Sequence, residues 1–267
     1  MKIMVTGPRG MLGCQVIAAA ERMGHEIAGT FYRKLEDPDI TKEIVVADCC
    51  PDVVINCAGL VPQRDPPPTA AEMMLVNGYG PWNLAEWCDD VGARLIHVSS
   101  DCVFDGNGKG PHDEMTNPRP RGPYGRSKAA GEVDREPHLT VRTSFVGFGK
   151  RGLITELQLC AENGETYRAS DALWWSGHCA PFVAEALVLL AERKDLQGVI
   201  HIPGEDMTRH DLVHRIKAVF EMDDLVIGRT NAYAVDRRLM PRVWEREGLP
   251  PLPPFDWQLE WLNRSRS

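Results

Sequence analysis

The sequence predicts an α/β protein: a Rossmann-like, doubly wound parallel sheet with a small C-terminal substrate lobe. Short apolar runs rich in β-branched residues alternate with longer helix-like segments, and a glycine-rich loop follows the first run. The chain has 267 residues, 43% of them hydrophobic, which is enough for a full core. Continuous apolar strands of this kind are typical of sheets that helices cover on both faces.

The elements follow one another in a regular order up to about residue 147. The expected strands are Ile3–Thr6, His25–Phe31, Val53–Cys57, Arg94–Ser99, Leu139–Thr143 and 198–202. The expected helices are Met11–Met23, Ala71–Val91 with a kink or break at Pro81, one that begins at Tyr124, and segments near 152–162, 180–193 and 208–220. We therefore expect an NAD(P)-binding Rossmann domain at 1–147 and a small substrate-binding lobe at 148–267. Segments of the lobe can be interleaved with the first domain.

Composition and charge limit the classes of function. The formal net charge is −8, which argues against general binding of nucleic acid or anionic membranes, and neither is expected as a partner. The chain moves directly into a strand-like run, without a signal-like segment or a membrane-spanning apolar run, so we expect a cytoplasmic protein. The eight cysteines lack paired C-x-x-C spacing, so we expect reduced thiols and no metal site. A homodimer is left open.

The glycine loop "TGPRGMLG" lies between the first strand and the first helix. Its G-x-x-G-x-x-G spacing suits a tight turn, a close backbone approach and a helix N-terminus directed at a pyrophosphate. A plain turn at a helix start is the alternative, but the position of the loop favours dinucleotide binding. The residues expected to contact the cofactor here are Gly7, Gly10, Met11, Leu12 and Gly13.

The segment after the second strand bears on the choice of cofactor. An acidic residue that would bind the adenosine ribose is missing there, and Arg33 and Lys34 stand in its place. Two cations suit a 2′-phosphate, so the sequence favours NADP(H) over NAD(H), although NAD remains an alternative. Two solvated loop charges are the other interpretation. Asp39 and Ile40 are expected beside the adenine.

The stretch "YGRSK" sets Tyr124 and Lys128 four residues apart, on one face of the expected helix. Ser100 follows the strand Arg94–Ser99 directly. A ketone that accepts hydride also needs a proton, which a tyrosine can donate if its pKa, about 10 when free, is lowered towards the working pH. We expect Lys128 to supply the positive charge for this and Ser100 to hydrogen-bond the carbonyl oxygen. The three are the predicted catalytic residues of a keto reduction.

These motifs, in this order, resemble the extended short-chain dehydrogenase/reductase family. The stretches "PDVVINCAG", "VSSDCVFDG", "YGRSKAAGE" and "VRTSFVG" are most similar to its dTDP-4-dehydrorhamnose reductase branch, and less so to the non-catalytic regulatory β subunit of methionine adenosyltransferase. The resemblance implies that Lys128 holds the nicotinamide ribose and that Phe145 lines the substrate pocket. It also implies further cofactor-binding residues at Cys57, Ala58, Gly59 and Asn77, and substrate-binding roles for Ser100 and Asp101.

The resemblance implies NADPH-dependent reduction of a keto group on a nucleotide-activated deoxysugar. Dehydratases of the family carry an Asp-Glu pair where this chain has Asp101 and Cys102, and a thiol is a poor base for elimination, so dehydration is disfavoured. Two alternatives stay open. One is a sugar-nucleotide epimerase that retains NAD, and the other is a non-catalytic NADP-binding regulatory subunit.

Overall fold

The computed structural model describes residues 1–267 except 32–49, 109, 151, 203, 232–233 and 266–267. The strands among the described residues are β1 Lys2–Thr6, β2 Glu26–Phe31, β3 Val53–Asn56, β4 Arg94–Val98, β5 Leu139–Thr143, β6 Phe145–Val146, β7 Thr166–Ser170, β8 Leu173–Cys179, β9 Gly198–Ile202, β10 Glu205–Thr208, β11 Val226–Thr230 and β12 Val235–Asp236. The helices are α1 Gly13–Arg22, α3 Ala70–Met73, the π-helix η1 Met74–Tyr79, α4 Gly80–Val91, the 3-10 turn η2 Asp101–Val103, α5 Gly122–Ala130, α6 Leu153–Glu162, α7 Ala180–Glu192, α8 Arg209–Val219, α9 Arg242–Arg246 and α10 Phe255–Arg264.

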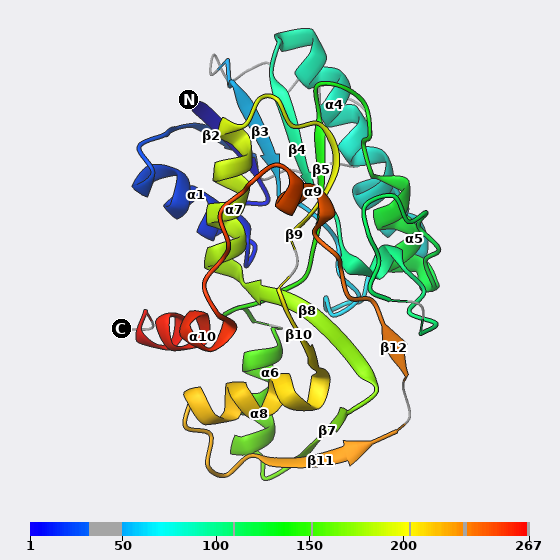
Figure 1. The fold of residues 1–267 in the computed structure, drawn as a ribbon, viewed down its shortest axis with the longest axis vertical. Helices are drawn as coiled ribbons and strands as arrows, with labels where there is room; N and C mark the ends of the chain where they lie inside the picture. Colours follow the sequence, from blue (N-terminus) through cyan, green and yellow to red (C-terminus); the bar gives the residue numbers. More distant parts are fainter. Residues whose placement is uncertain (32–49, 109, 151, 203, 232–233, 266–267) are drawn as a thin grey trace.

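A six-stranded parallel sheet in the order β2-β1-β3-β4-β5-β9 forms the centre of the molecule. Figure 1 shows α1 and α7 on one side of this sheet and α4 and α5 on the other. The predicted α/β fold with a parallel sheet is confirmed. Because β2 and β3 lie on opposite sides of β1, the chain changes direction there, and the carboxyl ends of β1 and β3 leave the crevice where such folds bind ligands.

The apolar strand residues explain why helices cover both faces. Every residue of β3 and β4 is buried, as expected for central strands of a parallel sheet. Val5 and Val16 belong to the core under α1 and α7, and Val54, Leu84 and Trp87 belong to the core under α4. The two cores hold the carboxyl ends of the strands, and the loops that follow them, in fixed relative positions.

Three helices differ in detail from the expectation. The first begins at Gly13, so Met11 lies in the preceding turn instead of in the helix. The segment Ala71–Val91 is divided by the π-helix η1, and Pro81 lies in the first turn of α4, after the irregularity. The helix expected to begin at Tyr124 begins at Gly122, because Pro123 suits a first helical turn, where no intrahelical N–H is needed.

The chain beyond residue 147 forms a smaller layer and also returns to the central sheet. Strands β10, β8 and β12 form a second sheet, β6 joins β8, and β7 pairs with β11 beside α6 and α8 (Figure 1). Strand β9 completes the central sheet next to β5. The division near residue 147 stays a prediction, with the two parts interleaved at β9. Within the described part of the chain, no helix combines the length and apolarity that crossing a membrane requires.

Candidate active site

Ser100 lies at the carboxyl end of β4, where it is buried and opens the turn η2. Its Oγ accepts a hydrogen bond from the backbone N–H of Cys102 at 3.1 Å and donates to Oδ1 of Asp101 at 3.1 Å. Burial raises the pKa of Asp101, and the charge of Arg237 opposes this shift. The Ser100 hydroxyl is therefore fixed at the edge of the sheet that faces the crevice.

Tyr124 lies in the first turn of α5 and is half-buried. Burial raises the pKa of the Tyr124 phenol, the nearby Cys102 adds to this rise, and a hydrogen bond with Ser100 lowers the pKa. The structure thus brings Ser100 and Tyr124 together. It also keeps the phenol protonated at neutral pH, because burial is the largest of these effects.

Lys128 lies one turn further along α5 and is buried. Its Nζ donates to the carbonyl oxygen of Val98 at 2.6 Å and lies 3.5 Å from Nε2 of His97. Burial lowers the pKa of Lys128 to about 8, whereas Glu132 and Cys57 act to raise it.

One expectation about Tyr124 is wrong for this structure. We expected the ammonium group of Lys128 to lower the pKa of Tyr124, but that pKa is raised, with burial as the main cause. The reason lies in the direction of the lysine side chain, because its Nζ is bonded to Val98 at the end of β4. Residue spacing places the two side chains on one helix face, but it reports neither burial nor where the ammonium group points.

The glycine loop has the geometry that its spacing predicts. Gly7 adopts φ +65°, and a Cβ there would lie 2.8 Å from the backbone of Ala58. A Cβ on Gly13 would lie 2.2 Å from the carbonyl oxygen of Gly7, and Gly10 N–H donates to the same oxygen at 2.9 Å. A side chain is thus excluded at Gly7 and at Gly13, and the N–H groups at the start of α1 follow the loop directly. These residues fit the pyrophosphate of a dinucleotide.

The other predicted cofactor residues fall into three sets. Cys57, Ala58 and Gly59 follow β3, where the backbone of Cys57 and Ala58 packs against Gly7 of the glycine loop. Burial raises the pKa of Cys57 to about 12. Met11 and Leu12 lie within the loop. The predictions for Arg33, Lys34, Asp39 and Ile40 lie outside the described residues.

Asn77 is buried in the π-helix η1 and holds the loop after β3 against α5. Its Oδ1 accepts from the N–H of Leu60 at 2.7 Å, and its Nδ2 donates to the carbonyl of Leu60 at 2.8 Å and to Oγ of Ser127 at 3.1 Å. A direct contact with a cofactor stays a prediction. The observed bonds position Gly59, the neighbour of Leu60.

Phe145 lies in β6, at the start of the chain segment that leaves the central sheet. It is half-buried and packs against the core formed with α1 and α7. Its role as a substrate pocket wall stays a prediction.

Two features of the site had no recognisable motif. Arg237 reaches from the end of β12 to the turn after Ser100, where its Nε donates to the carbonyl of Phe104 at 2.9 Å. Glu132 accepts two bonds from Arg142, at 2.8 and 2.7 Å, and one from Oγ of Ser99 at 2.7 Å. The side chains of Glu132 and Arg142 are 7% and 3% exposed, so they form a buried ion pair. It joins the segment after α5 to β5 and, through Ser99, to the end of β4.

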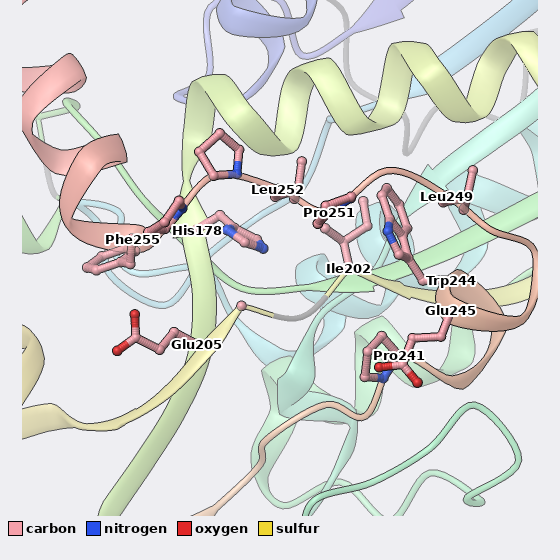
Figure 2. Close-up of a pocket in the computed structure, with 13 residues that line it drawn as sticks. His178, Ile202, Glu205, Pro241, Trp244, Glu245, Leu249, Pro251, Leu252 and Phe255 are labelled. Atoms are coloured by element: carbon pink, nitrogen blue, oxygen red, sulfur yellow. The ribbon is translucent and has the colours of Figure 1, made fainter.

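A pocket of about 330 Å³, shown in Figure 2, is lined by neither Ser100, Tyr124 nor Lys128. Its lining combines apolar side chains with His178 and two carboxylates. The residues that line it include Ile202, Glu205, Trp244, Glu245, Leu252 and Phe255. None of the predicted site residues lines this pocket. Among the described residues, no group of three His, Cys, Asp or Glu side chains could hold a metal ion.

Comparison with known proteins agrees with the fold and with the motifs. The sequence matches the family described as "RmlD substrate binding domain" over residues 1–247. A dTDP-4-dehydrorhamnose reductase of Mycobacterium tuberculosis is 34% identical over 233 residues, which cover 82% of this chain and 75% of that protein. A dTDP-4-keto-6-deoxy-D-glucose reductase of Streptomyces niveus is 29% identical and covers 93% of this chain and 92% of its own length.

A solved structure shows the same fold. The dTDP-4-dehydrorhamnose reductase of Bacillus anthracis, in complex with NADP, superposes with a TM-score of 0.85 at 20% identity, covering 100% of this chain and 99% of that one. The family match spans both the glycine loop and the Tyr124–Lys128 segment. The chain therefore belongs to the RmlD substrate-binding domain family, within the extended short-chain dehydrogenases/reductases.

Proposed function

We propose that the protein is an NADPH-dependent reductase of a keto group on a nucleotide-activated deoxysugar. The observation that carries this proposal is the contact between Ser100 and Tyr124 at the carboxyl end of β4, with Lys128 one turn further along the same helix. The reductases of Mycobacterium tuberculosis and Streptomyces niveus support the substrate class by their similarity.

In the proposed reaction the bound NADPH supplies a hydride to the carbonyl carbon. Tyr124 donates its phenolic proton to the carbonyl oxygen, which yields the alcohol. The raised pKa of Tyr124 means that the acid carries its proton when the substrate binds, and it also makes the phenol a weaker acid than the sequence predicted. Ser100 orients the carbonyl oxygen through its hydroxyl. The ammonium form of Lys128, one turn further along α5, is the proposed source of the proton that returns Tyr124 to its phenol form after the transfer.

The chemistry of Cys102 supports reduction over dehydration. Elimination of water from a sugar needs a base at this position, and the dehydratases of the extended short-chain dehydrogenase/reductase family have a carboxylate there. Burial raises the pKa of Cys102 to about 12, with the charge of Asp101 adding to the rise. The thiol therefore stays protonated near neutral pH and cannot act as that base.

A screen of keto-sugar nucleotides tests the proposal. Purified protein and NADPH are incubated with each compound, and both NADPH oxidation and the reduced sugar product are measured. We expect stoichiometric formation of the alcohol with at least one compound. Isomerisation of a sugar nucleotide by tightly retained NAD⁺, without net NADPH consumption, would instead establish an epimerase, and NADPH binding without any turnover would favour a regulatory subunit.

The pH dependence of the reaction should report on Lys128. Its pKa of about 8 predicts that kcat falls as pH rises through this value, because the amine form can no longer return a proton to the phenolate of Tyr124. Initial rates between pH 6 and about 10 measure the effect. The Lys128→Arg variant is the control: its charge persists over this range, so the inflection should vanish even if the rate is lower. An unchanged inflection in that variant would assign it to another group.

Cofactor preference should depend on Arg33 and Lys34. Replacing both by Ala is expected to weaken NADPH binding by about tenfold or more and to change NADH binding little, because charge-assisted bonds to the 2′-phosphate are lost. Calorimetric titration with both cofactors measures this. The matched control replaces two other exposed cations, Lys194 after α7 and Arg246 at the end of α9, by Ala. Equal affinities of the unmodified protein for NADPH and NADH would contradict the prediction.

A further inference from the structure

A row of polar side chains crosses the central sheet and ends at Lys128. The register of the parallel strands sets Thr6 of β1 beside Asn56 of β3, and Asn56 beside His97 of β4. All three are buried, with no exposed surface. Side chains at paired positions of neighbouring strands point to the same face, so they meet one another and form a continuous row. His97 then faces Lys128 from α5.

The backbone fixes the orientation of the Asn56 amide. The N–H of Ala58 lies 3.1 Å from Oδ1 of Asn56, and a backbone N–H can only donate. The hydroxyl of Thr6, which accepts from the same N–H at 3.3 Å, donates to Oδ1 at 2.5 Å. The amide oxygen is therefore directed at Ala58 and Thr6, and the NH₂ group faces His97.

This orientation also fixes the proton on His97. Nδ2 of Asn56 lies 3.0 Å from Nδ1 of His97, so Nδ1 accepts the hydrogen bond. Burial, together with the charge of Lys128, holds the pKa of His97 well below its usual value, so the ring is neutral at neutral pH. A neutral imidazole whose Nδ1 accepts carries its proton on Nε2. That Nε2 is the atom 3.5 Å from Nζ of Lys128.

An N–H group that faces Nζ discriminates between the two states of Lys128. An ammonium group has donors only, so the two N–H dipoles oppose each other. A neutral amine has a lone pair that accepts from Nε2, while one of its own hydrogens still reaches the carbonyl of Val98. We propose that Asn56 and His97 are positioning residues that hold a proton donor against Lys128 and thereby favour the neutral amine form of its side chain.

The other groups around Lys128 oppose this effect or leave it intact. Glu132, beyond the end of α5, and Cys57, after β3, both favour the charged form. Burial and the His97 N–H act in the other direction. The balance allows Lys128 to gain and lose a proton near neutral pH, in agreement with its pKa of about 8. If the protein is the proposed keto reductase, this exchange can return a proton to Tyr124, so that use rests on the proposed function. The protonation state of Lys128 itself does not depend on it.

The first test observes His97 directly in the unmodified, full-length protein. Two-dimensional ¹H–¹⁵N spectra of ¹⁵N-histidine-labelled protein distinguish the two neutral tautomers, and the His97→Phe variant identifies the His97 signals by their loss. We expect His97 to stay neutral with its proton on Nε2 between about pH 6 and 8. A proton on Nδ1, or a charged ring, would overturn the proposal whatever any variant does.

The second test measures Lys128 and needs no catalysis. The protein contains eight lysines, so ¹³Cε labelling gives few signals, and Lys128→Met identifies the relevant one. In Asn56→Asp the carboxylate can still accept from Ala58 and Thr6, but it draws the His97 proton to Nδ1 and leaves a lone pair on Nε2. We expect the Lys128 titration midpoint to rise by about one pH unit or more.

The added negative charge of Asn56→Asp needs its own control, because charge alone also raises the midpoint. The same substitution is therefore introduced into the His97→Phe background, which keeps a ring but no nitrogen. If the effect passes through the tautomer, most of the rise disappears in that background, whereas an equal rise in both backgrounds would overturn the proposal. These midpoints are obtained without substrate, so a failed substrate screen would refute the proposed function and leave this inference standing.

Discussion

Replacing Tyr124 by Phe is expected to lower kcat for keto reduction by about 10²–10⁴-fold, the range that a general acid contributes. The substitution removes only the hydroxyl group and keeps the half-buried ring at the start of α5. The affinity for NADPH should change little, because the glycine loop, which we expect to hold the pyrophosphate, is untouched. Single-turnover rates at saturating substrate, with a separate titration of NADPH binding, measure the two quantities.

Tyr79→Phe is the matched control for this prediction. Tyr79 ends the π-helix η1 and is 53% exposed, so removal of its hydroxyl should leave kcat unchanged. A Tyr124→Phe protein that reduces its substrate at the normal rate would show that another group supplies the proton. A loss of NADPH binding together with activity would indicate a structural effect of the substitution instead of a chemical one.

Replacing Glu132 by Ala should lower the free energy of unfolding by about 3–5 kcal/mol. The carboxylate accepts two bonds from Arg142 and one from Ser99, so its removal leaves a buried guanidinium group without its counter-charge. The same change frees Ser99, the neighbour of Ser100, and therefore should also loosen the end of β4. Urea unfolding followed by circular dichroism measures the first effect.

The exposed pair Arg264–Glu260 provides the control for Glu132. Its side chains are 71% and 56% exposed at an N–O distance of 3.0 Å, and Glu260→Ala should cost no more than about 0.5 kcal/mol. A comparable cost for both substitutions would show that burial does not set the strength of the Glu132–Arg142 pair. Glu132→Gln, which keeps the shape and part of the hydrogen bonding, should fall between the two.

The features that sequence predicted well are those that depend on neighbours along the chain. The glycine loop follows β1 and precedes α1. Gly7 packs against the backbone of Ala58, and Gly13 against the carbonyl oxygen of Gly7, because neither glycine has a side chain. The alternation of strands and helices predicted the parallel sheet, because right-handed strand–helix–strand crossovers leave few alternative topologies. The contact between Ser100 and Tyr124 was predictable, because Ser100 lies at the carboxyl end of β4 and Tyr124 at the start of α5, at the same edge of the sheet.

The features that sequence did not predict depend on register or on long-range packing. Asn56 and His97 lie in runs that read as plain buried strands, and only the pairing of β3 with β4 sets them side by side. Arg237 reaches the turn after Ser100 from a strand that carries no motif. The raised pKa of Tyr124 was missed for a similar reason: burial is a property of the folded molecule, and desolvation outweighs any influence of helix spacing.

The position of β9 has a consequence for the synthesis of the protein. When the ribosome has released β5, this strand still lacks its outer neighbour, which is Gly198–Ile202. The apolar cover that α7 provides also lies beyond β5 in the chain. In the nascent chain, one edge of β5 therefore stays unpaired until most of the chain has been translated, although every residue of this strand is buried in the folded protein. Premature termination anywhere between β5 and β9 would release polypeptides with an open sheet edge. We expect such polypeptides to be bound by chaperones or degraded by proteases, and not to be partly active enzymes.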